Sequence, residues 1–257
     1  NEILDSSIFI NKNRIDIVIG IEYVDFYENK YNTDFFIDLY IEYKRSFNGL
    51  KEDHYSGKND FINRFNNLID SMKEKKGNTI PIEIKKYNKE YWVVNGFHRA
   101  SISYYYKLPL LTEVTKRTKK FGWYPCNINL FIKNKYNLKF CNYTMECFFK
   151  KYKKKFSCII FFPSEKNIPD ELFNIIKNDI IYKLEIYNNG DLKKFQNNFI
   201  AMLYYNEKWC IKGGYKGKSN ECFSEKGYLK IFFIEKKELN FLNNYKNLGL
   251  QNPTKSI

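Results

Sequence analysis

The sequence predicts an α/β protein, of the α+β type, built from two domains, and three observations support this prediction. Short segments with alternating apolar residues, typical of strands, recur between segments with apolar residues at three- and four-residue spacing, typical of helices. The 257 residues suffice for one large domain or two of ordinary size. Residues 1–118 hold 18 Lys/Arg and 17 Asp/Glu (net +1), whereas residues 119–257 hold 25 and 12 (net +13). We therefore expect a first domain over residues 1–118 and a lysine-rich α/β domain over residues 119–257.

The first elements are predicted to be a strand and a helix, with a run of acids between them. Residues 15–19 alternate as a strand. Glu22, Asp25 and Glu28 follow at three-residue spacing, which places them on one face only where the segment is helical. We expect one of these acids near the functional site. A helix capped at position 33 or 34 then runs to about residue 45, and its aromatic stripe is most simply core.

A polar loop over residues 47–58 precedes the clearest helix signal, an amphipathic segment that is capped by Asp60 and ends at the glycine at position 77. Long loops held by a rigid scaffold are often functional. Glu52 is our candidate for a general base that accepts the proton of an attacking hydroxyl, and Lys58 for the cation that neutralises a transferred phosphoryl group. The alternative is an ordinary solvated loop.

A strand, a turn and a helix are predicted around Gly96. Residues 79–84 and 91–95 read as two strands joined by a turn, and a helix follows and closes at residues 107–110. A glycine here lets the backbone approach closely and leaves the first N–H groups of the helix free for an anion. His98 and Arg99 would add side-chain donors. The predicted phosphate pocket comprises Asn95, Gly96, His98, Arg99, Ala100 and Ser101. The alternative is a turn whose polar tip binds nothing.

The order I-P-I-x-I, turn, V-V-N-G-F-H-R-A, helix, L-P-L resembles the ParB/sulfiredoxin-like fold, whose members carry G-E-R-R, G-C-H-R or D-G-H-H-R at this turn. The resemblance covers roughly residues 14–114. It implies a nucleotide bound with its phosphates on the turn, used by different members for CTP-gated clamping on DNA, ATP-driven repair of an oxidised thiol, or phosphorylation of free serine. The implied cofactor is ATP or another nucleotide, with Mg²⁺; no protein metal ligand is assigned.

Three departures from the family patterns narrow these functions. Phe97 stands where the sulfiredoxin-like branch has its reactive cysteine, which disfavours thiol repair. Asn95 replaces the aspartate of the D-G-H-H-R branch and so removes one carboxylate of a kinase-like mechanism. Ile102 stands where the ParB motif ends in a small alanine. The resemblance therefore supports the pocket better than any one reaction.

The second half also alternates between strand and helix signals. A helix-turn-helix DNA reader is not indicated, because strands recur throughout this half. A lysine- and glycine-rich segment at residues 209–219 lacks P-loop spacing; one interpretation of it, not the leading one, is a mobile basic hairpin that contacts an anionic substrate. The other expected elements are strands at 127–132, 158–162, 180–187 and 228–234, and helices at 169–177, from an Asp191 cap to 205, and at 239–248.

Cysteine and histidine usage limits the metal chemistry. All six cysteines lie in the second half, and none share C-x-x-C spacing, so we expect reduced and mostly buried thiols. Only two histidines are present, which excludes a His-rich metal centre. No segment is apolar enough to cross a bilayer and no signal peptide is evident, so we expect a cytoplasmic protein without a transmembrane segment.

The net charge of +14 would attract polyanions such as nucleic acid. However, all five arginines lie in the first half, so the basic half contains only lysine. Lysine suits diffuse attraction and not bidentate readout of bases. The richness in Lys, Asn, Ile, Tyr and Phe is equally explained by an AT-rich genome.

Three functions follow from these features. The leading one is a nucleotide-dependent phosphotransferase acting on a small hydroxylated acceptor such as an amino acid or a sugar, with Glu52, Lys58, His98 and Arg99 as catalytic residues. The second is a ParB-like nucleic-acid-binding protein or nuclease, in which lysines contact phosphates and aromatic side chains stack on bases. The third is a non-catalytic, nucleotide-gated interaction module.

Overall fold

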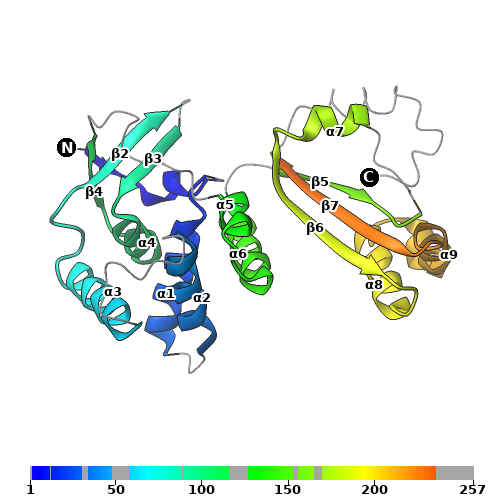
Figure 1. Cartoon of the computed structure of the whole chain (residues 1–257), viewed down its shortest axis with the longest axis horizontal. Helices are drawn as coiled ribbons and strands as arrows, with labels where there is room; N and C mark the ends of the chain where they lie inside the picture. Colours follow the sequence, from blue (N-terminus) through cyan, green and yellow to red (C-terminus); the bar gives the residue numbers. More distant parts are fainter. Residues whose placement is uncertain are drawn as a thin grey trace. The chain divides into compact units, whose positions relative to one another are not determined.

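The computed structural model describes residues 2–11, 13–30, 34–47, 58–87, 90–115, 127–152, 156–164 and 170–235. The protein is α+β and divides into two compact units, residues 1–153 and 154–257 (Figure 1). The helices α5 (Ile128–Lys133) and α6 (Leu138–Lys151), expected in the lysine-rich half, thus belong to the first unit. With this boundary the first unit carries a net charge of +8 and the second +6, so the positive charge is shared between them.

The first unit contains a four-stranded sheet in the order β1-β4-β2-β3. Strands β2 (Ile82–Tyr87) and β3 (Glu90–Asn95) form an antiparallel hairpin, as predicted. Strand β4 (Leu110–Val114) pairs parallel to β2 and antiparallel to β1 (Glu2–Leu4). The helix α4 (Phe97–Tyr106) connects β3 to β4. The predicted order of helix, strand, turn, strand and helix is therefore present.

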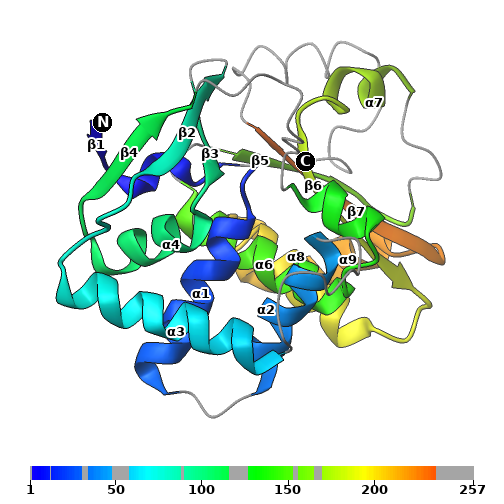
Figure 2. The same ribbon diagram turned by 60° about the vertical axis from the view of Figure 1, so that its left-hand side comes forward.

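The helix α1 (Asp16–Asn29) occupies the segment that was expected to start with a strand. The strand prediction for residues 15–19 was wrong because a short run of buried apolar residues fits a strand and a buried helix equally well, and periodicity alone does not separate the two. Here Ile17, Val18, Ile19 and Ile21 are all buried. α1 packs against α2, α4 and α6 in the middle of the unit (Figure 2). The first part of α1, from Asp16 to Val24, is buried on every face, so its apolar residues show no amphipathic period.

The helices α2 (Asp34–Phe47) and α3 (Lys58–Glu74) match the predicted helices. Asp60 lies in the first turn of α3, not at its cap. Together with α1 and α4, these helices enclose an aromatic cluster in which Tyr23 stacks on Phe65 with ring centroids 4.9 Å apart, and Tyr40 lies 5.4 Å from Phe65. Residues 48–57, which include Glu52, lie outside the described residues.

The second unit is built on an antiparallel sheet in the order β5-β7-β6. The strands β5 (Phe156–Phe161), β6 (Ile180–Asn188) and β7 (Gly227–Glu235) confirm the three predicted strands. Leu229 and Ile231 pack in one cluster with residues of α8 (Lys193–Leu203) and α9 (Tyr215–Cys222), while Phe232 and Ile234 pack with Ile176 of α7 (Asp170–Ile176). Alternate residues of β7 therefore serve the two faces of the sheet.

Three further expectations for the second half were wrong. Residues 127–132, expected as a strand, form α5, because the Asn127 side chain accepts a hydrogen bond from the Leu130 N–H and caps a helix. The segment interpreted as a basic hairpin is the π-helical turn η2 (Cys210–Gly214), which contains Gly213 at φ +89° and is followed directly by α9. Asp191 does not cap α8, whose N-cap is Leu192. The helix predicted at 239–248 lies outside the described residues.

Candidate functional site

The turn predicted to bind phosphate joins β3 to α4. Its central residue, Gly96, has φ +99°, a left-handed conformation that favours glycine. A Cβ atom at this position would lie 2.6 Å from Cγ2 of Ile82 on β2. The glycine is therefore required both by the backbone conformation and by the close packing of the turn on β2.

The backbone N–H groups that open α4 are the main donors of the predicted phosphate pocket. The Ala100 N–H donates to the Gly96 carbonyl, but among the described residues nothing accepts from the N–H groups of Phe97, His98 or Arg99. No side chain caps α4, and its first turn contains no acidic residue. Three parallel donors at the positive end of a helix dipole are suited to an anion.

The Arg99 side chain already forms hydrogen bonds within the protein. Its Nη1 atom donates to the carbonyl oxygens of Ile80 at 2.7 Å and Pro81 at 3.0 Å, which fixes the segment leading into β2. Its Nη2 atom lies 2.9 Å from the position that a Cβ of Gly96 would occupy, so it faces the turn. Burial lowers the pKa of the guanidinium, and the charge of Glu83 acts in the opposite direction. One edge of Arg99 is thus structural, and the other lies beside the open amides.

His98 is enclosed by aromatic rings. Its Nε2 atom is 2.6 Å from the Tyr40 hydroxyl oxygen. Its ring centroid lies 4.2 Å from that of Phe65 and 3.9 Å from that of Phe97. Burial, reinforced by the charges of Lys44 and Arg99, holds the pKa of His98 well below its usual value. His98 is therefore neutral at pH 7 and offers a hydrogen-bonding nitrogen without a positive charge.

The depressed pKa of His98 predicts a pH-dependent stability. Between its folded pKa and about 6.5, the unfolded chain binds a proton at this position and the folded chain does not, so the free energy of unfolding falls as the pH falls. The slope is up to about 1.4 kcal/mol per pH unit. Urea unfolding between pH 7 and pH 5 should show this slope in the wild type and a shallower one in His98→Phe. Parallel slopes would contradict the assignment.

Sequence reasoning missed Lys44, which brings a cation from α2 to this turn. Its Nζ atom lies 4.9 Å from the ring centroid of Phe97, and its charge contributes to the lowered pKa of His98. The aromatic residues of this helix were expected to belong to the core, and a lysine beside such a stripe is normally expected to be solvated. The only local signal is its position four residues after Tyr40, on the same helix face.

The other predicted site residues have different surroundings. Ala100 and Ser101 are fully buried, and the Ser101 hydroxyl donates to the carbonyl oxygens of Ile17 and Phe97. Their side chains therefore serve packing between α4 and α1. Asn95 is exposed at the end of β3. Lys58 begins α3, but its side chain, like all of Glu52, lies outside the described part of the structure. The structure thus brings together Gly96, His98, Arg99 and Lys44.

Comparisons of the chain with family models, with curated proteins and with solved structures each found no match. Within the residues that the structure describes, no three His, Cys, Asp or Glu side chains are grouped so that they could hold a metal ion. In the same residues, no helix combines the length and the apolar character that crossing a membrane requires.

Proposed function

We propose that the first unit is a ParB/sulfiredoxin-like nucleotide-binding unit that holds phosphates at the start of α4 and transfers a phosphoryl group to a small hydroxylated acceptor, such as an amino acid or a sugar. The observation that carries the proposal is the set of open N–H groups at Phe97, His98 and Arg99, with the Lys44 ammonium and one edge of the Arg99 guanidinium nearby. Backbone amides and two cations are the usual partners of phosphate.

Each residue has a distinct part in this proposal. The amides and Arg99 Nη2 hold phosphate oxygens, and Lys44 offsets the negative charge of these oxygens. The Nε2 atom of neutral His98 contacts the Tyr40 hydroxyl, and its other ring nitrogen, Nδ1, hydrogen-bonds the nucleotide. Glu52 accepts the proton of the acceptor hydroxyl, and Lys58 neutralises the transferred group, both on sequence grounds.

Mg²⁺ fits this donor set. When phosphates supply most of its ligands, Mg²⁺ needs only one or two protein carboxylates. Glu83, whose charge acts on Arg99, is the candidate carboxylate. The ion would neutralise charge that develops on the transferred phosphoryl group.

A non-catalytic, nucleotide-gated module is the second candidate. This candidate is favoured because the side chains of His98 and Arg99 already form hydrogen bonds within the protein. His98 contacts the Tyr40 hydroxyl, and Arg99 donates to the carbonyl oxygens of Ile80 and Pro81. A site that only binds phosphate needs the amides and the cations but no base. Consumption of the nucleotide separates the two functions.

Thermal unfolding with ATP, ADP, CTP and GTP, each with and without Mg²⁺, tests the proposal. Binding at 100 times Kd adds about 2.7 kcal/mol, which raises Tm by roughly 5–10 °C. With the nucleotide that binds, ³¹P NMR should show phosphoryl transfer to a hydroxylated acceptor such as serine. Glu52→Gln should keep the Tm shift and lose the transfer. If no nucleotide raises Tm, phosphate binding at this turn is refuted; if one binds without being consumed, the second candidate is supported.

A further inference from the structure

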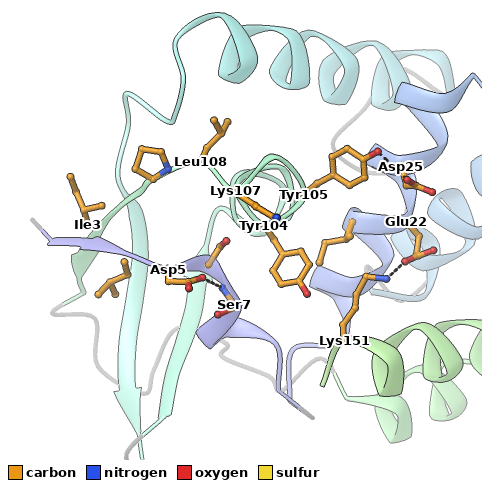
Figure 3. Close-up of a pocket in the computed structure, with 14 residues that line it drawn as sticks. Ile3, Asp5, Ser7, Glu22, Asp25, Tyr104, Tyr105, Lys107, Leu108 and Lys151 are labelled. Carbon is orange, nitrogen blue, oxygen red and sulfur yellow. Dashed lines mark hydrogen bonds and ion pairs between the residues drawn. The ribbon is translucent and has the colours of Figure 1, made fainter. Parts of the chain in front are cut away.

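A cavity of about 800 Å³ lies in the first unit, at the opposite end of α4 from the Gly96 turn (Figure 3). It is lined by β1, the 3-10 helix η1 (Ser6–Phe9), α1, the C-terminal end of α4 and Lys151 of α6. The ten residues of α4 span about 15 Å, so the cavity is separate from the proposed nucleotide site. Its volume is typical of sites for small molecules.

One pair of charges in the cavity wall is already neutralised. Glu22, only 9% exposed, accepts hydrogen bonds from Lys151 Nζ and, at 2.9 Å, from the Tyr143 hydroxyl. Both of its carboxylate oxygens are therefore occupied, and the ion pair links α1 to α6. Figure 3 shows Glu22 and Lys151 on one side of the cavity and Asp5 and Ser7 on the other, with Tyr104 between them.

Two further charged side chains in the wall are those of Asp25 and Lys107. Asp25 Oδ1 accepts hydrogen bonds from the Tyr105 hydroxyl and from Asn29 Nδ2, each at 3.0 Å, and both donors are neutral. Lys107 follows α4 as its left-handed C-cap. Within the described residues, neither the Asp25 carboxylate nor the Lys107 ammonium forms an ion pair. Besides the Glu22–Lys151 pair and Asp5, whose Oδ1 atom accepts a hydrogen bond from the Ser7 N–H, the lining thus contains one carboxylate and one ammonium that form no ion pair with another described residue.

Neutral polar groups and apolar side chains complete the lining. Ser6 is only 4% exposed, and its hydroxyl, like that of Tyr104, forms no hydrogen bond with another described residue. Both hydroxyl groups belong to lining residues of the cavity and can each donate and accept a hydrogen bond there. The apolar part of the wall includes Ile21, Leu108 and Pro109.

We propose that this cavity binds a small zwitterion with an apolar body, of the class of free apolar α-amino acids. Its ammonium pairs with Asp25, its carboxylate pairs with Lys107, and its side chain packs on Ile21 and Leu108. A purely cationic or purely anionic ligand would form a charge-assisted contact with only one of these two wall charges, whereas a zwitterion can form one with each. The ligand is distinct from the acceptor of the proposed transfer, because the nucleotide site lies at the far end of α4. The inference stands without the proposed function.

Isothermal titration of the whole chain with leucine, 3-methylbutylamine and 4-methylpentanoate tests this proposal, because the two analogues each lack one charge of leucine. Leucine should bind at least about tenfold more tightly than either analogue. Asp25→Asn should weaken leucine about tenfold and leave 4-methylpentanoate unchanged. Lys107→Met should weaken leucine and 4-methylpentanoate but not the amine. Lys133→Met, which removes an exposed lysine on α5, should change nothing.

Three outcomes would overturn the proposal. The first is that leucine gives no heat of binding at millimolar concentration. The second is that Asp25→Asn and Lys107→Met, each shown to fold by circular dichroism, bind leucine as the wild type does. The third is that the amine binds as tightly as leucine, which would make the cavity a site for cations.

Discussion

Gly96→Ala is expected to lower the free energy of unfolding by about 2–4 kcal/mol. Two causes add. The left-handed φ of +99° strains any residue that has a Cβ atom. The new methyl group would also lie 2.6 Å from Cγ2 of Ile82, which is fully buried, and 2.9 Å from Arg99 Nη2. Overpacking of this kind typically costs about 1–3 kcal/mol. Urea unfolding of the two proteins measures the difference.

Gly217→Ala is the matched control. Gly217 lies inside α9, and a Cβ atom there would meet nothing within 4 Å. Alanine is the better helix former, so this change should raise stability by up to about 1 kcal/mol. A Gly96→Ala protein as stable as the wild type would show that the turn does not pack on β2 as described.

Lys44→Met is expected to weaken nucleotide binding about tenfold or more. The change removes the ammonium that lies 4.9 Å from the Phe97 ring centroid, and it keeps an apolar stem that can pack on the same ring. Fold stability should change little, whereas the affinity should fall because a charge-assisted contact to phosphate is lost. Isothermal titration with the nucleotide that gives the largest Tm shift makes the measurement.

Lys75→Met provides the control for charge, because Lys75 is exposed just after α3. It lowers the net charge by the same amount, so diffuse attraction of the nucleotide would weaken equally in both variants. If Lys44→Met and Lys75→Met bind the nucleotide with equal affinity, Lys44 does not contact the bound nucleotide.

The strand, turn and helix around Gly96 could be predicted because the signals are local. Alternation in β2 and β3, the glycine, and the helix that follows all lie within 30 residues. The surroundings of the turn could not be predicted in this way. The contacts of Lys44 with Phe97 and of Tyr40 with His98 join residues more than 50 positions apart. Nothing in the sequence nearby specifies such pairs.

The errors in the secondary structure have physical causes as well. Residues 15–19 look like a strand because a helix buried on every side loses its amphipathic pattern. The expected domain boundary followed the shift in charge, but packing decides which helices form a unit. Residues of α6 contact α1 through the Glu22–Lys151 ion pair, which no property of composition reveals.

The most direct test of phosphate binding at the start of α4 is a nucleotide titration followed by ¹H–¹⁵N NMR. We predict that the backbone amide resonances of Phe97, His98 and Arg99 move downfield and saturate with one common Kd, as expected for N–H groups that gain an anionic acceptor. Gly96 should broaden or shift with them. A different result would contradict the account: the resonances of these amides do not move, while those of lysine-rich surfaces shift at low salt and no longer shift at high salt. The nucleotide would then bind by diffuse charge attraction and not at this turn.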